Sequence, residues 1–295
     1  MTGAIIIFLF YAVVLLLDHF EERRRRMAEY TEECVPPSID QTDIVYQGTS
    51  DSIDQEEMEN ILVKRYRYYV QLEQSLKEKF LQRLHHFMNS KTFIIKSNEG
   101  FKEMPVLVSA AAIQLTFGLS DYLLPFYRYI RIFPSEYSGD DFLKVLAGNV
   151  EDNTITIAWN QFLKGNEDLT DGSNVGLHEM SHALYFQKLI IDGNYAKEFR
   201  KSYNSLLSEC REASQTEIAG RKNLYSAYAD TNLQEFWAES VEIFFEKPTE
   251  LSDQYPSVFE AMKTVLNQDP LNNACPIIHI PSSLSQRVRK FLKAK

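Results

Sequence analysis

The stretch SNVGLHEMSHALYF, residues 173–186, constrains this chain more than any other part of it. It contains the pattern H-E-x-x-H, in which His178 and His182 would share one face of a helix. Two imidazoles on one face can bind a single zinc ion, with Glu179 beside the ion's water as a general base. Two ligands do not complete a catalytic zinc site, so the fold must bring a third ligand from elsewhere.

The residues before the motif favour this helix. Asp171, Gly172 and Ser173 offer turn and capping chemistry before Asn174, and apolar residues surround the polar stripe that follows. The alternative interpretation is two histidines that are hydrogen-bonded within a core. We favour the metal site, because the complete pattern lies on a predicted helix.

The third ligand has to be sought among histidines and carboxylates. None of the remaining histidines follows the motif at a short distance; they are His19, His85, His86 and His279. A carboxylate on a later helix is the alternative.

The segment YADTNLQEFWAESVEIFF, residues 228–245, offers such a carboxylate. Its T-x-x-Q pattern is a capping box, which predicts a helix beginning near Asn232. Glu235 and Glu239 would then lie on one face of that helix. Burial of a carboxylate against a core costs free energy unless the carboxylate is paired or bound to a metal, which favours a ligand role for one of this pair. The alternative interpretation is that both glutamates lie on a solvated surface of the helix.

The N-terminal residues predict a membrane anchor. Residues 2–17 are uncharged and mostly apolar, and Arg23–Arg26 follow them. As a helix the run would span roughly 24 Å, somewhat short of the ~30 Å hydrocarbon core, and snorkelling side chains can compensate. A cleaved signal peptide would place its positive charge before the run, and a core helix would show a polar face. We therefore expect a single-pass protein of the inner (cytoplasmic) membrane whose domain faces the cytoplasm.

The net charge and the cysteines argue against several other classes of protein. The formal net charge of -10 argues against a nucleic-acid partner, because phosphate binding needs a basic face. The three cysteines are an odd number without close spacing, which indicates neither a disulfide framework nor a cysteine metal site. Cysteines without a disulfide framework are typical of proteins in a reducing compartment.

The pattern along the chain predicts an α+β fold and four regions. These are an anchor with a basic flank (1–26), an acidic flexible tether (27–60), a folded domain (61–270) and a C-terminal tail (271–295). Apolar periodicity predicts a long helix around residues 72–87 and further helices at about 105–117, 173–191, 196–212, 233–246 and 256–267. Strands are expected at 126–133, 142–148 and 153–159, the last two forming a hairpin with its turn at 149–153.

Five segments resemble one family in order and approximate spacing, over about residues 72–270. They are YIRIFPSEY, ITIAWNQFLKG, DGSNVGLHEMSH, YADTNLQEFWAESVEIFFEKP and YPSVFEAMKTVLNQDP. The family is that of Mlc titration factor A (MtfA), zinc metallopeptidases of gluzincin type whose core is related to lethal-factor-type toxin peptidases. The resemblance implies a zincin-like domain, in which a small sheet is followed by the active-site helix and a helical C-terminal part, and one Zn²⁺ ion.

The resemblance also assigns roles. His178 and His182 would be zinc ligands, Glu235 the third ligand and Glu179 the catalytic base. Tyr228, seven residues before Glu235, would stabilise the oxyanion.

Helix and sheet geometry give two further expectations. Glu239 would accept a hydrogen bond from a ligand histidine and fix its tautomer. The segment NTITIAW would be a sheet edge that binds substrate through Ile155, Ile157 and Trp159; an ordinary core strand is the alternative.

The expected function is a membrane-anchored peptidase that cleaves a peptide or protein substrate with metal-activated water. One alternative is a regulatory module that keeps the fold, binds a protein regulator and has little or no peptidase activity. Another is a structural membrane-associated protein with an accidental motif. The anchor and acidic tether depart from the better-known soluble members of the family.

Overall fold

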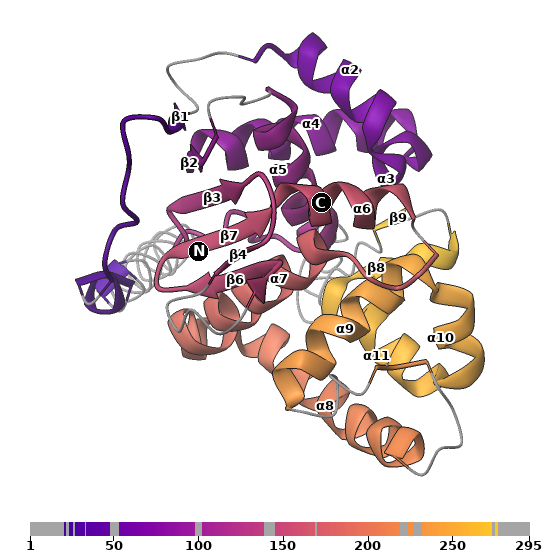
Figure 1. Ribbon diagram of the computed structural model, residues 1–295. Helices are drawn as coiled ribbons and strands as arrows, with labels where there is room; N and C mark the ends of the chain where they lie inside the picture. Colours follow the sequence, from indigo (N-terminus) through magenta and orange to yellow (C-terminus); the bar gives the residue numbers. More distant parts are fainter. Residues whose placement is uncertain are drawn as a thin grey trace, which may run out of the picture.

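A five-stranded mixed sheet and a set of helices make up the domain (Figure 1). The computed structural model of the 295-residue chain describes residues 21, 24–25, 27–32, 34–47, 53–97, 102–138, 145–168, 170–218, 224–226, 232–272 and 275–276. The strand order is β1 (Ile44–Gln47), β2 (Thr92–Ile95), β3 (Tyr129–Phe133), β7 (Thr154–Ala158) and β6 (Gly148–Glu151). β2, β3 and β7 run parallel, whereas β1 and β6 pair antiparallel with their neighbours at the two edges.

The helices connect the sheet strands and follow them. They are α2 (Gln55–Arg65), α3 (Arg67–Gln71), α4 (Gln74–Asn89), α5 (Glu103–Thr116), α6 (Trp159–Glu167), α7 (Val175–Tyr185), α8 (Lys197–Ile218), α9 (Leu233–Glu246), α10 (Pro248–Gln254) and α11 (Pro256–Leu266). Short elements are the π-helix η1 (Phe186–Ile191), the 3₁₀ helices η2 (Gly193–Ala196) and η4 (Pro270–Asn272), and the strand pairs β4 (Tyr137–Ser138) with β5 (Val145–Leu146) and β8 (Gln268–Asp269) with β9 (Cys275–Pro276). The mixed α+β architecture agrees with the sequence prediction.

The core side of the sheet consists of apolar rows that run across three strands. In one row Phe93, Ile130 and Ile155 are in register, and Ile95, Ile132 and Ile157 form the next. Ile155 and Ile157 are fully buried in these rows. The sheet-edge prediction for β7 is therefore wrong: the strand lies between β3 and β6, and its isoleucines form the core. Trp159 is also buried, at the start of α6, where it stacks on Phe162.

The hairpin at the sheet edge is shifted relative to the expectation. β6 begins at Gly148, and its turn into β7 falls at Asp152, whose φ of 47° is left-handed. Of the expected turn, residues 149–153, the first three residues (149–151) are strand residues that pair with β7. The polar composition of this segment concealed the strand, because an edge strand needs few apolar side chains.

The two helices that carry the candidate ligands pack against each other. α7 begins after the cap Asn174, whose side chain accepts a hydrogen bond from Leu177 N. α9 begins after Asn232, whose side chain accepts from Gln234 N and Glu235 N. The start of α9 near Asn232 is thus confirmed; Thr231 lies outside the described residues. α7 also contacts β6 and β7, so it lies between the sheet and α9.

The N-terminal boundaries differ from the expected ones. β1 and the first turns of α2 fall within the predicted tether, where β1 extends the sheet and Met58 of α2 is buried. Among the described residues no helix has both the length and the apolar character needed to cross a bilayer. The expected anchor, residues 1–26, and the C-terminal tail lie almost entirely outside those residues.

Candidate metal centre

Three side chains from α7 and α9 converge on one point. His178 Nε2 lies 3.1 Å from His182 Nε2, and Glu235 Oε2 lies 3.2 Å from the first nitrogen and 3.4 Å from the second. In a tetrahedral site with ligands ~2.0–2.1 Å from zinc, two ligand atoms are about 3.3–3.4 Å apart. The triangle of donor atoms therefore has nearly the dimensions that a tetrahedral ion requires.

The surroundings of Glu235 Oε2 also fit a cation. This oxygen is buried and has no hydrogen-bond partner, although it lies within ion-pair distance of both imidazoles. A buried carboxylate oxygen without a partner is costly, and a shared cation would remove that cost. Two imidazole nitrogens and one carboxylate oxygen are a ligand set typical of zinc sites.

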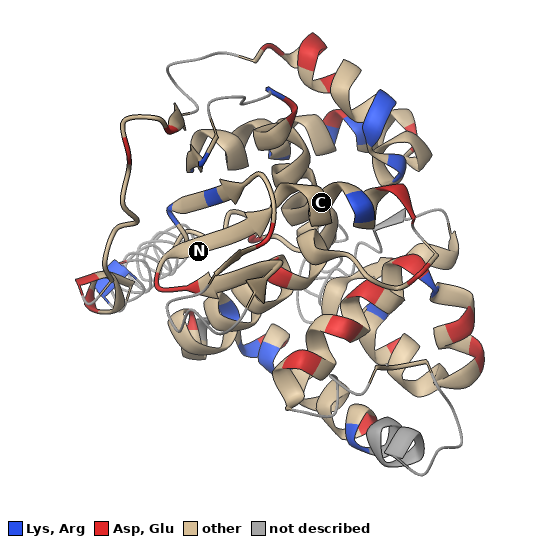
Figure 2. Ribbon diagram, viewed as in Figure 1, with Lys and Arg blue, Asp and Glu red and all other residues tan. Residues whose placement is uncertain are grey.

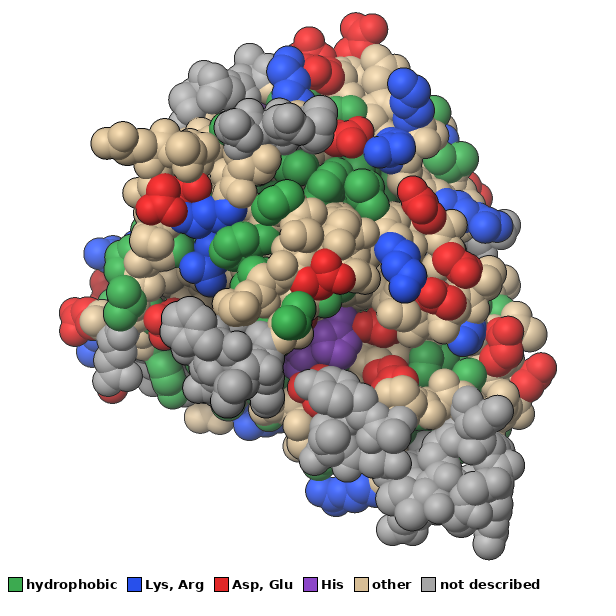
Figure 3. All heavy atoms as spheres, viewed as in Figure 1, with side chains coloured by type: hydrophobic (Ala, Val, Ile, Leu, Met, Phe, Trp, Pro, Cys, Tyr) green, Lys and Arg blue, Asp and Glu red, His purple; other side chains and the backbone are tan. Residues whose placement is uncertain are grey.

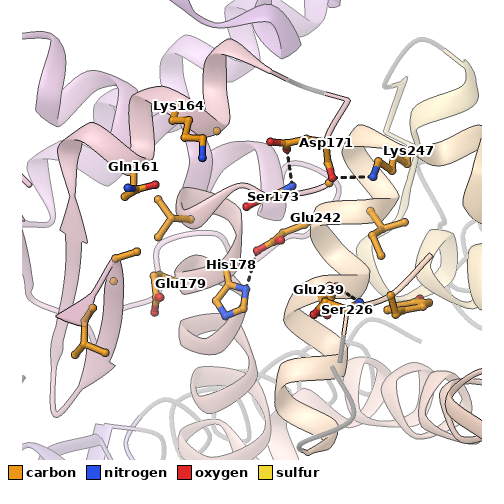
Figure 4. Close-up of a pocket in the computed structure, with 18 of the residues that line it drawn as sticks. Gln161, Lys164, Asp171, Ser173, His178, Glu179, Ser226, Glu239, Glu242 and Lys247 are labelled. Atoms are coloured by element: carbon orange, nitrogen blue, oxygen red, sulfur yellow. Dashed lines mark hydrogen bonds and ion pairs between the residues drawn. The ribbon is translucent and has the colours of Figure 1, made fainter. Parts of the chain in front are cut away.

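Glu242 orients the first histidine. Its Oε1 accepts a hydrogen bond from His178 Nδ1 over 2.7 Å, so His178 Nε2 faces the centre (Figure 4). We expected this contact from Glu239. Glu239 instead accepts hydrogen bonds from Ser226 N and Oγ, at 2.6 and 3.1 Å.

Helix geometry explains the exchange. At 3.6 residues per turn, position i+4 is rotated by about 40° from Glu235, whereas position i+7 returns to within about 20°. Glu242 therefore stays on the face of α9 that meets α7, and Glu239 turns towards residues 224–226. The signal that could have identified Glu242 was the spacing of seven residues.

The contacts between α7 and α9 show that the helices run antiparallel. Asn174 pairs with Glu246 and His178 with Glu242, while Trp237 Nε1 donates to Ser181 O over 3.0 Å. Trp237 is almost fully buried. Figure 2 marks acidic positions along the ribbon of α9 in red. Of its glutamates, Glu235, Glu242 and Glu246 contact residues of α7 or its cap.

Glu179 follows the candidate ligand His178 on α7, and its side chain is buried, with only 6% of the residue exposed. Burial raises its pKa to about 7; His178 opposes that rise, and Glu235 and Glu242 add to it. Burial alone would lower the pKa of His178, but the nearby carboxylates of Glu235 and Glu242 raise it to about 10. The carboxyl group of Glu179 is thus suited to accept and release a proton near neutral pH.

Strand β6 approaches Glu179 through a glycine. A Cβ atom at Gly148 would lie 2.6 Å from Glu179 Cγ and 2.7 Å from its Oε1. Real Cβ atoms do not approach so closely, so any other residue here would displace Glu179 or the strand. No sequence pattern predicts the role of Gly148, because its contact with Glu179 depends on the position of β6 in the folded chain.

Tyr228 lies outside the described residues. Its neighbours Tyr225 and Ser226 are described: Tyr225 stacks on Phe236 of α9 with ring centroids 4.3 Å apart, and Ser226 bonds Glu239. The expected role of Tyr228 therefore stays a prediction.

Two cavities open on the centre, and both are lined by Leu146, Gly148, His178 and Glu179. The first has a volume of about 610 Å³ and a charged lining that includes Lys164, Lys247, Glu239 and Glu242 (Figure 4). The second has a volume of about 520 Å³ and contacts all three candidate ligands. Figure 3 shows histidine side chains (purple) in a hollow of the surface with acidic side chains beside them.

Comparison with known proteins gives the family of the chain. Residues 47–266 match the family described as glucose-regulated metallo-peptidase M90. The chain is also 25% identical over 238 residues to an uncharacterized protein of Synechocystis sp., in an alignment that covers 72% of this chain and 84% of that protein. The family match includes α7 and α9 and confirms the resemblance seen in the sequence. This chain therefore belongs to the glucose-regulated metallo-peptidase M90 family, the MtfA family of metallopeptidases.

Proposed function

We propose that the chain is a zinc-dependent peptidase. The observation that carries this proposal is the triangle of donor atoms, with sides of 3.1, 3.2 and 3.4 Å, beside the buried carboxyl group of Glu179. The family supports a metallopeptidase-type function. Zinc, hydrolysis and the role of each residue are our inference.

His178, His182 and Glu235 would hold the ion, and Glu242 would keep the His178 tautomer that presents Nε2 to it. When bound, zinc lowers the pKa of water and polarises the carbonyl group of a substrate. Glu179 would take a proton from the attacking water and give it to the leaving amine. Tyr228 would donate a hydrogen bond to the oxyanion.

We place the substrate along β6 rather than β7. Among the described residues β6 is the last strand on its side of the sheet, so its outer edge can accept an extended peptide. Its residue Gly148 lines both cavities and contacts Glu179, which would bring a peptide on β6 close to the catalytic base.

We further propose that residues 1–26 anchor the protein in the cytoplasmic membrane with the domain facing the cytoplasm. This part of the proposal is supported by the apolar run and the arginines that follow it. Labelling of Cys34 from outside the cell by a membrane-impermeant reagent would contradict it.

The central test measures zinc content and hydrolysis of a mixed peptide library by the full-length protein. We expect about one zinc per chain and cleavage by the wild type. Glu179→Gln should keep its zinc and lose hydrolysis, whereas Glu235→Ala should lose zinc. Glu239→Ala is the matched control on α9 and should retain zinc.

One result would favour the alternative function. If the wild type holds zinc but cleaves no peptide that Glu179→Gln leaves intact, the chain is a regulatory binding module with the peptidase fold. If Glu235→Ala retains its zinc, the third ligand lies elsewhere.

A further inference from the structure

The cavity of about 520 Å³ is lined by a wall of aromatic residues as well as by the candidate metal ligands. We call this cavity the aromatic pocket. Its lining includes the ring-bearing residues Tyr30, Phe126, Tyr127, Tyr185 and Phe186. His178, His182 and Glu235 line the same cavity, so a group bound at the metal would share the cavity with these rings.

Phe186 holds the wall together. Its ring centroid lies 5.3 Å from that of Phe126, 6.1 Å from Tyr30 and 6.5 Å from Tyr127. Phe126 and Tyr127 are buried, whereas Tyr30 and Phe186 are half-buried. The wall is thus a packed aromatic cluster whose outer members still offer surface to an occupant.

Part of this wall comes from the segment before β1. Tyr30 and Cys34 line the pocket, yet they precede the family match, which begins at residue 47. Cys34 Sγ donates to Tyr30 O over 3.1 Å, and Val35 N donates to Asp152 Oδ2 over 3.3 Å in the β6–β7 turn.

Lys96 holds the same segment further along. Its Nζ donates to Ser38 O at 2.9 Å and pairs with Asp43 at 2.7 Å. The bond at Val35 and the bonds at Ser38 and Asp43 therefore hold the segment before β1 against the domain.

The charges of the pocket restrict what it can take. Among the described residues of its lining there is no lysine or arginine, while Asp152, Glu179 and Glu235 are acidic. An acidic side chain would be repelled there. An apolar ring or branched chain would bury its surface against the wall, and the volume lies within the ~300–1,000 Å³ range of ligand pockets.

We propose that the aromatic pocket binds an aromatic or large aliphatic side chain next to the scissile bond, and that Tyr30 sets this selectivity. The inference rests on the proposed function, because the pocket derives its position from the metal centre. It adds that a segment outside the family match selects the substrate of this chain.

The test uses amino-acid hydroxamates, which bind zinc without being turned over. Their affinities for the zinc-loaded, full-length protein are compared for benzyl, methyl and carboxymethyl side chains. We expect the benzyl compound to bind about 10-fold or more tightly than the methyl compound, and the carboxymethyl compound most weakly. Tyr30→Ala should reduce the benzyl-to-methyl ratio at least about 3-fold.

Two controls and one further variant make the test specific. Tyr30→Phe keeps the ring and should keep the ratio, as should Val35→Ala, a neighbour in the segment that does not line the pocket. Val150→Phe on β6 would fill the pocket and should weaken the benzyl compound more than the methyl compound.

Equal binding of the benzyl and methyl compounds would overturn the proposal, as would an unchanged ratio in Tyr30→Ala. Because hydroxamate binding needs no turnover, a benzyl preference in a protein that hydrolyses nothing would refute only the peptidase function. A protein that cleaves peptides but shows no preference would refute only the pocket.

Discussion

At the scale of single residues, the bond from His178 to Glu242 decides how well the centre binds metal. The carboxylate fixes the ring so that Nε2 faces His182 and Glu235. Loss of such an outer partner typically lowers metal affinity about 10–100-fold. We therefore expect Glu242→Gln to weaken zinc binding about 10-fold in competition with a chelating dye. Glu239→Gln, its matched control on α9, should bind zinc like the wild type. If Glu239→Gln weakens zinc binding and Glu242→Gln does not, Glu239 is the residue that orients the histidine.

Gly148 tests how closely Glu179 is positioned. The Cβ atom of Gly148→Ala would overlap the side chain of Glu179. We expect kcat/KM to fall about 100-fold, because small displacements of a catalytic group have effects of that size, while zinc content is unchanged.

Gly118→Ala is the control for a steric overlap that lies away from the metal centre. Its Cβ would meet the carbonyl oxygens of Leu266 and Asn267, and it lines neither cavity at the centre. This variant should lose thermal stability but keep the kcat/KM of its folded fraction. Full activity of Gly148→Ala would show that Glu179 can work from another position.

At the scale of elements, the antiparallel pair α7–α9 contains a buried acid that zinc does not explain. Glu246 Oε1 accepts from Asn174 Nδ2, but its Oε2 is buried without a hydrogen-bond partner. Burial raises the pKa of Glu246 to about 8; the bond from Asn174 opposes the rise, and Glu242 and Asp171 add to it. The folded protein thus binds this proton more tightly than the unfolded chain does, so the contribution of Glu246 to stability falls as pH rises from about 4.5 to about 8.

Replacement of Glu246 by Gln should remove this pH dependence. The amide keeps an acceptor for Asn174 but carries no charge, so Glu246→Gln should unfold a few degrees above the wild type at about pH 8. The difference should shrink towards pH 5, as thermal unfolding at several pH values would show. Glu250→Gln, an exposed position on α10, serves as the charge control. If Glu246→Gln is more stable than the wild type by the same amount at every pH, the pH dependence does not come from Glu246.

The elements also show what the sequence could and could not predict. H-E-x-x-H and the start of α9 followed from local patterns, because helix periodicity and capping depend on neighbouring residues. The sequence predicts a turn over part of strand β6, because the residues of β6 are polar and its pairing with β7 is a tertiary contact. The sequence predicts Glu239 as the orienting residue, because a spacing of four is the nearest repeat on a helix, whereas the crossing of α7 and α9 selects Glu242, seven residues after Glu235.

At the scale of the whole molecule, the metal centre joins parts that are distant in sequence. α7 contacts β6, β7 and α5, whereas α9 contacts α10 and α11 (Figure 1). The two histidines come from the first group and Glu235 from the second. An ion held by all three would therefore link the sheet side of the domain to its C-terminal helices, and its binding energy would be available only to the folded chain.

This coupling predicts that zinc removal destabilises the entire domain. Zinc at 1,000 times its dissociation constant would add ~4 kcal/mol to the free energy of unfolding. For a domain of this size that corresponds to a melting temperature roughly 10 °C lower in the chelated protein. Calorimetry of the full-length protein with zinc, with a chelator, and with zinc restored would measure the shift. His182→Ala removes one corner of the triangle, and with it one of the three ligands, so the melting temperature of this variant should not respond to either treatment. If verified zinc removal leaves the wild-type melting temperature unchanged, the ion does not hold α7 and α9 together.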